Sequence, residues 1–396
     1  MKVPFKVVAP LVAALAIAAC NGGGNSSVPG APGQVGAQAV HIPHWQATHS
    51  AVPACAGSRI GQAQCDVLIT TGVHPNTAGL SAANLEDAYK LPSTTKGKGA
   101  SVYIVDAYDN PNVASDFAEY RSVMGLPVGT LNKYNQEGQK SNYPQGNTGW
   151  GVEIDLDVEM VSASCPNCTV NLIEANSNGG SDLGASEKEA VALGATIVSN
   201  SYTGGGLDGS DYDTAGVTYL ASAGDSGYGL LDPAAFGSVV AVGGTALSPN
   251  TASKRGWNEV VWQDSGGGCS TESKPSWQKD PDCSSRTGAD ISAQASGEVA
   301  EYDSYGEGGW FLVGGTSVSS PFIGGVFALA GNSTKQNGGE NFWKLSKKKI
   351  KKDLYYVSSG NDGSCGGEYL CTAGTKQFGD FSGPTGWGTP HGIGAF

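Results

Sequence analysis

Apolar and polar positions follow two different periods along the chain from residue 81 onward. The segment Ser81–Leu91 has helical spacing and opens on a serine that can cap a helix. The apolar run Ala100–Ala107 predicts a strand, and a second helix is expected near residues 113–123. A polar stretch rich in Asn, Gln and Gly then predicts a loop.

This alternation continues through the middle of the chain. It favours a doubly wound α/β fold, with a mainly parallel sheet flanked by helices, in a single domain over residues 81–396. Strands are expected at residues 169–174, 196–202, 217–223 and 238–242, and helices at 151–163 and 182–193.

The N-terminus predicts a targeting segment. Lys2 and Lys6 precede the apolar stretch Val7–Ala19, which is typical of a signal peptide over residues 1–19 and is too short to span a bilayer. The stretch ends at Cys20 in a sequence that resembles a bacterial lipobox. We therefore expect a lipid at Cys20 and export to the outer membrane, facing the periplasm or the cell surface. The alternative is an ordinary secretory signal with an incidental cysteine, which would leave the protein secreted.

Two short segments connect this leader to the helical and strand-forming part. Residues 20–40 are rich in Gly, Ser and Pro and predict a flexible tether. Residues 41–80 contain proline and cysteine and show no clear period.

Composition excludes several classes of protein. The 60 glycines among 396 residues have no three-residue period, which excludes collagen, and 39% hydrophobic residues exclude a disordered chain. The net charge of -13 argues against nucleic acid, because phosphates require a basic surface. We expect a monomer without an organic cofactor.

Nine cysteines leave eight once Cys20 is set aside, and these form four local pairs. Eight cysteines can pair in many ways, and Cys165-Pro-Asn-Cys168 also fits a redox or zinc motif. An exported chain favours structural bridges. The expected disulfides are Cys55–Cys65, Cys165–Cys168, Cys269–Cys283 and Cys365–Cys371.

One candidate for chemistry is the glycine-rich turn Gly314–Pro321, which runs into the apolar stretch Phe322–Ala330. Such a turn places Ser317 at the N-terminus of a buried helix, where free N–H groups and the helix dipole favour a developing anion. The alternative for Ser317 is a capping serine.

A second candidate is Glu153-Ile-Asp-Leu-Asp157, in a segment with helical spacing. Glu153 and Asp157 are four residues apart, so their carboxyl groups share one helix face and one pKa should rise. The alternative is that acids in a first turn complement the helix dipole, which is the role expected of Asp155 and Glu159.

The third candidate is Gly224-Asp225-Ser226-Gly227, directly after an expected strand. It resembles the nucleophile motif of chymotrypsin-like proteases, whose mechanism needs a histidine base. The five histidines are at positions 41, 44, 49, 74 and 391, and none lies in the middle of the chain. That mechanism is therefore excluded.

In combination, and in the chain order Glu153-x-x-x-Asp157, Gly224-Asp225-Ser-Gly and Gly315-Thr-Ser317-x-Ser, the three motifs resemble those of the sedolisin (serine-carboxyl peptidase) family. The resemblance covers residues 81–396. Smaller matches are Ser199-Asn-Ser-Tyr202, Ala241-Val-Gly-Gly-Thr245, Ser265-Gly-Gly-Gly268 and Pro384-Thr-Gly-Trp-Gly-Thr-Pro390.

The resemblance implies a subtilisin-like fold and an endopeptidase that cleaves protein or peptide substrates. Ser317 would be the nucleophile and Glu153 the general base, positioned by Asp157, while a protonated Asp225 would donate to the oxyanion. Because carboxyl groups replace imidazole, activity should peak in acid. Ser199, Tyr202, Gly266 and Gly267 would line the peptide groove.

The chain departs from the family pattern in two places. Only about 60 residues separate Cys20 from Ser81, where relatives carry a large prodomain. The family's calcium site would use Asp353, Leu354 and a second aspartate, but Ser382 occupies that second position and Asp380 lies two residues earlier. The sequence therefore leaves both outcomes open: calcium binding at this site, or no calcium.

Two other functions remain open. A subtilisin-like site would use Asp106 with Ser317, but it lacks a histidine at a plausible position. A different class is a catalytically inactive relative that serves as a surface adhesin or peptide-binding module, although all four catalytic positions are intact.

Overall fold

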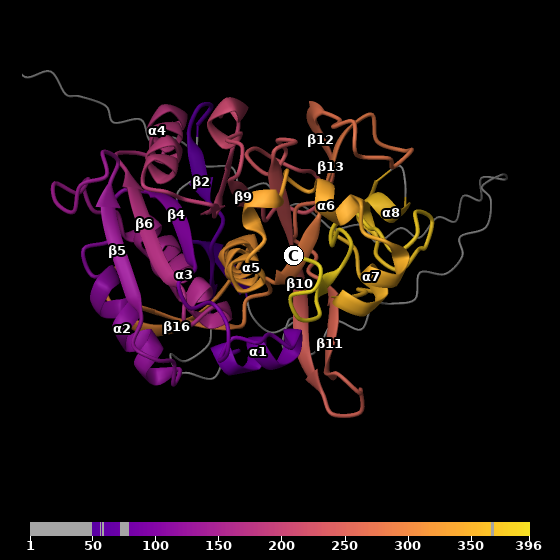
Figure 1. Cartoon of the computed structure of the whole chain (residues 1–396), viewed down its shortest axis with the longest axis horizontal. Helices are drawn as coiled ribbons and strands as arrows, with labels where there is room; N and C mark the ends of the chain where they lie inside the picture. The colour runs from indigo at the N-terminus through magenta and orange to yellow at the C-terminus, as the bar shows by residue number, and fades with distance from the viewer. Residues whose placement is uncertain (1–49, 56, 58, 72–78, 366–367) are drawn as a thin grey trace, which may run out of the picture. The chain divides into compact units, whose positions relative to one another are not determined.

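Eight strands form the central sheet, which runs across the molecule in Figure 1. Their order is β11-β10-β9-β7-β4-β6-β5, with β14 also paired to β10. All neighbours are parallel except β10 and β11. The strands are β4 (Ser101–Ala107), β5 (Thr130–Asn135), β6 (Thr169–Ala175), β7 (Ile197–Asn200), β9 (Thr218–Ser222), β10 (Val239–Asn250), β11 (Gly256–Val261) and β14 (Ile291–Gln294).

The computed structural model describes residues 50–55, 57, 59–71, 79–365 and 368–396. The expected signal peptide, the tether and Cys20 lie outside this range. Within it, no helix has the length and apolar character needed to cross a membrane.

Helices cover both faces of the sheet, as alternate residues of β4 demonstrate. Val102 faces Gly324 in helix α5 (Thr316–Ala330), whereas the hydroxyl of Tyr103 donates to the carbonyl of Leu193, directly after helix α4 (Gly180–Ala192). Because successive side chains of a strand point to opposite faces, α5 and α4 lie on opposite sides. The doubly wound fold is therefore confirmed.

Helix α3 (Thr148–Ser164) packs against α5 on the same side of the sheet. The approach is close because Gly325 has no side chain, and a Cβ there would lie 1.9 Å from Oγ of Ser164. This packing brings the middle of α3 to the first turn of α5.

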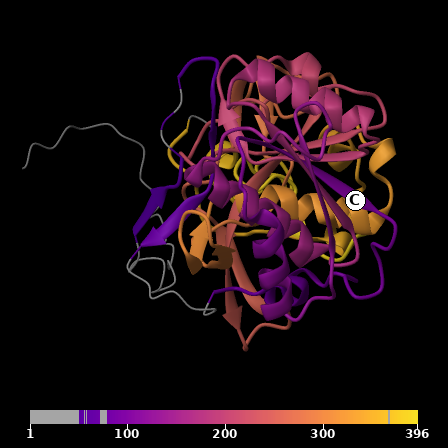
Figure 2. The same cartoon turned by 90° about the vertical axis from the view of Figure 1, so that its left-hand side faces the viewer.

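A second sheet joins the N-terminal segment to the strand that precedes α5. Its order is β1-β3-β16-β15, and Figure 2 shows the indigo strands β1 and β3 beside the orange ones. A separate short strand, β2, pairs with β8. The bounds are β1 (Ser50–Pro53), β2 (Ala63–Cys65), β3 (Leu68–Thr71), β8 (Tyr202–Gly204), β15 (Val299–Asp303) and β16 (Gly309–Gly314).

The remaining elements surround these sheets. They are α1 (Ala82–Tyr89), α2 (Val113–Val123), α6 (Glu340–Trp343), α7 (Lys347–Asp353), α8 (Glu368–Cys371), the short 3-10 helices at Gly209–Tyr212 and Ser333–Lys335, and the strands β12 (Gly268–Ser273), β13 (Ser285–Gly288), β17 (Leu354–Tyr355) and β18 (Thr389–Pro390).

Most of the expected elements are present. Ser81 caps α1, and its hydroxyl accepts a hydrogen bond from the backbone of Asn84. The loop expected after α2 is wrong in part, because Thr130–Asn135 forms the edge strand β5; its polar residues gave no apolar signal. All four expected disulfides are present: Cys55–Cys65, Cys165–Cys168, Cys269–Cys283 and Cys365–Cys371.

Candidate active site

Ser317 lies in the first turn of α5, where the sequence predicts it. Gly315, which separates β16 from this helix, has a φ of 115° that a residue with a side chain rarely adopts. The Ser317 hydroxyl donates a hydrogen bond of 2.9 Å to Oε2 of Glu153, and both residues are fully buried. A hydroxyl at a helix N-terminus thus contacts a carboxylate that could accept its proton.

Two further buried carboxyl groups surround Glu153. Asp157 lies one turn later on α3, and Asp106 lies near the end of β4 on the face that α3 and α5 cover. Neither carboxylate oxygen of Asp106 has a hydrogen-bond partner among the described residues. Asp106 therefore lies in the site. The subtilisin-like alternative would have used Asp106 together with a histidine, whereas here Asp106 is a further acid beside Glu153 and Asp157.

The pKa values of this group are raised. Burial raises the pKa of Glu153 and Asp157 well above their ordinary values, and repulsion from Asp157 and then Asp106 raises that of Glu153 further. Burial raises the pKa of Asp106 to about 8. These groups can therefore hold protons at mildly acidic pH, which is a property of carboxyl groups that carry protons in catalysis.

Asp225 lies on the other side of the α5 N-terminus, in the turn that follows β9. Its Oδ1 accepts hydrogen bonds of 2.8 Å from both the backbone N–H and the hydroxyl of Thr316, whereas Oδ2 has no partner among the described residues. Burial and then the neighbouring Asp66 raise the pKa of Asp225 well above its ordinary value. A protonated Oδ2 could donate a hydrogen bond beside Ser317.

In the part of the chain that the structure describes, His391 is the only histidine. Its ring stacks on Tyr355 with the ring centroids 4.3 Å apart. The ring of His391 therefore packs on Tyr355, and both residues are remote in sequence from α3 and the start of α5.

The structure places the expected groove residues in different surroundings. Ser199 is fully buried and its hydroxyl pairs with that of Ser320 at 3.0 Å, so it faces α5 rather than a groove. The side chain of Tyr202 is also buried and donates to Oδ1 of Asn200, while its backbone lies opposite Cys65 of β2. Alternating strand residues point to opposite faces, and the sequence motif alone did not tell which face was open.

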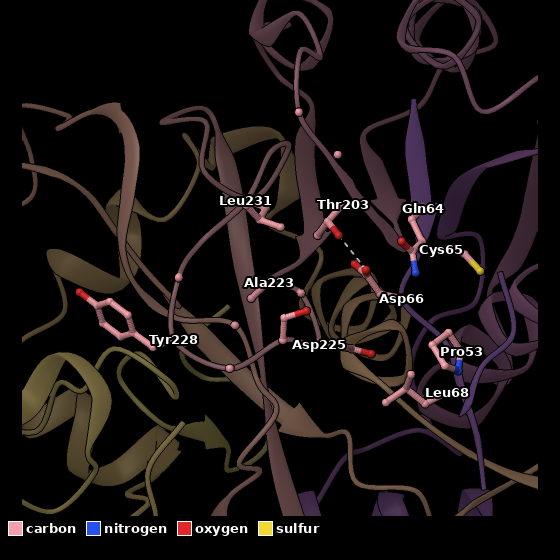
Figure 3. Close-up of a pocket in the computed structure, with 17 residues that line it drawn as sticks. Pro53, Gln64, Cys65, Asp66, Leu68, Thr203, Ala223, Asp225, Tyr228 and Leu231 are labelled. Carbon is pink, nitrogen blue, oxygen red and sulfur yellow. Dashed lines mark hydrogen bonds between the residues drawn. The ribbon is translucent and has the colours of Figure 1, made fainter. Parts of the chain in front are cut away.

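A cavity of about 380 Å³ lies beside Asp225 (Figure 3). Gly266 lines it, while Gly267 pairs with the backbone of Gly229 next to it. The cavity is also lined by Asp66, which no local sequence motif singles out. Asp66 is separated from Asp225 by more than 150 residues of chain, so only the pairing of the N-terminal segment brings it here.

The expected calcium ligands Asp353 and Leu354 lie where α7 meets β17. Asp353 forms an ion pair with Lys352, and Asp380 forms one with Lys376. The one described group of three carboxylates that could hold a metal ion is elsewhere, at Asp116, Asp155 and Asp303. Calcium binding at Asp353 and Leu354 therefore gains no support from the side chains present.

Known proteins resemble this chain in sequence and in structure. The model of the subtilase family matches residues 143–356. Sedolisin from Pseudomonas sp. (strain 101) is 27% identical over 351 residues, a match that covers 76% of this chain and 58% of sedolisin's own length.

Solved structures agree with the sequence comparison. A structure described as Pseudomonas sedolisin, a serine-carboxyl proteinase complexed with two molecules of pseudo-iodotyrostatin, has a TM-score of 0.65 and 26% identity, covering 80% of this chain and 96% of that one. A structure described as the S41 psychrophilic protease shares the fold, with a TM-score of 0.50, 16% identity and coverage of 80% and 99%. The likeness to the sedolisins that the motifs indicate is thereby confirmed, and the chain belongs to the subtilase family.

Proposed function

We propose that this protein is an endopeptidase that uses Ser317 as nucleophile and carboxyl groups in place of histidine. The observation that carries the proposal is the hydrogen bond of 2.9 Å from the Ser317 hydroxyl to Glu153, at the N-terminus of a buried helix. Membership of the subtilase family and the likeness to sedolisin, which is described as a serine-carboxyl proteinase, support the same chemistry.

The reaction would proceed in two halves. Oγ of Ser317 attacks the carbonyl carbon of the substrate while its proton passes to Glu153. Glu153 then gives the proton to the leaving amine, and the C–N bond breaks to leave an acyl-enzyme. A water molecule, deprotonated by Glu153, releases the acid product and restores the serine.

Asp157 and Asp225 would have supporting roles. Asp157 positions Glu153 and raises its pKa, so that the proton can be held and released in the acid range. Asp225 would stay protonated and donate to the tetrahedral oxyanion together with the backbone N–H of Ser317. Because this donor must keep its proton, the activity should decline toward neutral pH.

The proposed location is outside the cytoplasm, with a lipid on Cys20 and the catalytic part attached through the tether. Labelled fatty acid should be incorporated into the wild-type protein and not into a Cys20→Ser variant, which should leave the membrane fraction. Equal labelling of both proteins would contradict lipid attachment at this residue.

Hydrolysis of denatured casein at pH 4 tests the activity. Wild type should digest it, and Ser317→Ala should not. Ser319→Ala is a matched control, because its buried hydroxyl lies two residues later in α5 and donates only to the Thr316 carbonyl. Equal digestion by Ser317→Ala, or no digestion by wild type, would favour the inactive peptide-binding relative.

A further inference from the structure

The N-terminal segment passes through the site as an extended strand. β2 pairs antiparallel with β8, with Gln64 opposite Thr203 and Cys65 opposite Tyr202. The backbone N–H of the next residue, Asp66, donates to the carbonyl of Ser201 at 3.3 Å. Proteins commonly bind an extended peptide by letting it pair, as an added strand, with an exposed strand edge.

This strand reaches the reacting groups at Asp66. The carbonyl oxygen of Ser201 that accepts from Asp66 also lies 3.5 Å from Oγ of Ser317. Gly315 has no side chain, and a Cβ there would lie 2.0 Å from the Asp66 carbonyl oxygen and 2.6 Å from Oδ2 of Asp225. The carbonyl of Asp66 and the unpartnered oxygen of Asp225 thus face the same small space beside the nucleophile.

The side chain of Asp66 occupies a polar pocket. Its Oδ1 accepts a hydrogen bond of 2.8 Å from the Thr203 hydroxyl, which Figure 3 shows, and its Oδ2 accepts one of 2.6 Å from Ser222. Only 7% of Asp66 is exposed. Thr203 comes from β8 and Ser222 from the end of β9, so the two hydroxyls belong to the enzyme's own framework.

We propose that residues 63–66 occupy the substrate groove as a substrate would, with Asp66 in the first side-chain pocket, and that Thr203 and Ser222 make this pocket select acidic residues. The proposal rests on the proposed endopeptidase function and names its substrate class: peptides cleaved after aspartate or glutamate. The bond that the segment presents in its own chain is Asp66–Val67.

Selectivity follows from the two hydroxyl groups. An apolar side chain in the pocket would leave the two hydroxyl groups buried without a hydrogen-bond partner. The free-energy cost of such burial is greater than that of losing one exposed hydrogen bond. A site built to hydrogen-bond a substrate group strongly rejects an analogue that lacks it. The pocket borders the cavity of about 380 Å³, which Asp66 and Thr203 also line.

Peptides of the form Ala-Gln-Ala-X-Val-Leu, which copy residues 63–68 with alanine at the cysteine position, test the pocket. The full-length Asp66→Ala variant is used, because it weakens the internal occupant, and kcat/KM is measured at pH 4. Peptides with Asp or Glu at X should be cleaved at least about tenfold faster than peptides with Leu or Lys. Cleavage of the Leu peptide as fast as the Asp peptide would overturn the proposal.

Variants of the pocket make the assignment specific. Thr203→Val with Ser222→Ala should reduce the preference for Asp over Leu to about threefold or less. Thr218→Val is the matched control, because it removes a buried hydroxyl from the same strand, β9, that donates to Ser333 instead. An unchanged preference in the double variant would show that other groups select the side chain.

A binding measurement separates this proposal from catalysis. Ser317→Ala combined with Asp66→Ala should bind Ala-Gln-Ala-Asp at least about tenfold more tightly than Ala-Gln-Ala-Leu by calorimetry. If that preference holds and no variant cleaves any peptide, the proposed function fails and the pocket stands. Equal binding of the two peptides would overturn the pocket.

Mapping the cut sites that wild type makes in denatured casein provides a result even if Asp66→Ala is unstable. Enrichment of cuts after Asp and Glu would support the proposal, and a profile without that enrichment would contradict it.

Discussion

Helix α3 carries buried acids on two of its faces, and only one face meets a nucleophile. Glu153 and Asp157 face Ser317 and Asp106. Asp155 and Glu159, two residues further along in each case, face the opposite way.

The second acidic face is held by hydrogen-bond donors of a different kind. Oδ2 of Asp155 accepts from the side chain of Asn110 at 2.6 Å, and Glu159 accepts from the backbone of Tyr302 at 3.3 Å. Further acids, Asp116, Glu301 and Asp303, surround them. None of these donors is a hydroxyl group at a helix N-terminus.

The comparison of the two faces shows that a raised pKa does not by itself identify a catalytic site. Burial raises the pKa of Asp155 and Glu159 well above their ordinary values, as it does for Glu153. What distinguishes Glu153 is its contact with Ser317. The expectation that Asp155 and Glu159 complement the helix dipole is wrong, because α3 begins at Thr148 and has no acid in its first turn.

The largest predicted difference between the faces is in the rate of catalysis. Glu153→Gln should lower kcat by about 10²–10⁴-fold, because the amide cannot take the serine proton. Glu159→Gln, the same change on the same helix, should alter kcat by less than about threefold. Steady-state kinetics on a denatured protein at pH 4 provide the comparison, and similar losses in both variants would remove the distinction between the faces.

The next effect concerns the oxyanion donor. Asp225→Ala should lower kcat by about 10²–10³-fold, because a transition-state hydrogen bond is lost. Asp225→Asn keeps a donor and should recover most of that loss. Asp303→Asn, on the other acidic face, serves as the control and should leave kcat unchanged; failure of Asp225→Asn to recover any activity would contradict the donor role.

A smaller effect is expected in the pH profile. The charge of Asp157 raises the pKa of Glu153, so Asp157→Asn should move the acid limb of kcat/KM to lower pH. Asp155→Asn should not move it, because Asp155 does not face Glu153. A profile that shifts equally in both variants would indicate a general change in the fold.

The smallest effect concerns stability. An unfolded carboxyl has a pKa of about 4, and burial raises the folded pKa of Asp106 to about 8. The folded chain therefore binds more protons than the unfolded chain between these values, and the free energy of unfolding should decrease as pH rises from about 4 to about 8.

Thermal unfolding measures this loss of stability. The Tm should be lower at pH 8 than at pH 4, and Asp106→Asn should reduce the difference, by about 2–4 °C for each kcal/mol of unfolding free energy that no longer depends on this acid. A Tm that increases between these pH values would contradict the sign.

How far the sequence predicts the site depends on sequence distance. Glu153 and Asp157 lie four residues apart, and Ser317 follows a glycine-rich turn, so local patterns are enough to select them. The placement of Asp66 depends on β2 pairing with β8, which lies more than 130 residues away, and no local pattern encodes that pairing. The acids around Asp155 come from α2, α3 and β15 and are equally non-local.

The fold shows the same limit at its edge. The apolar strands β4 and β6 are clear from sequence because both of their faces are buried. Strand β5 is an edge strand with mostly half-exposed residues, so its composition resembles that of a loop. Ser199 illustrates a different difficulty. The sequence can predict a strand without indicating which face of that strand borders the substrate groove.

The pH dependence of kcat/KM of the wild-type protein on a denatured substrate tests the central claim most directly. If carboxyl groups do the work of histidine, the rate should be maximal below about pH 5 and at least about tenfold lower at pH 7. A rate at pH 7 equal to or above that at pH 4 would contradict carboxyl-based catalysis at Ser317.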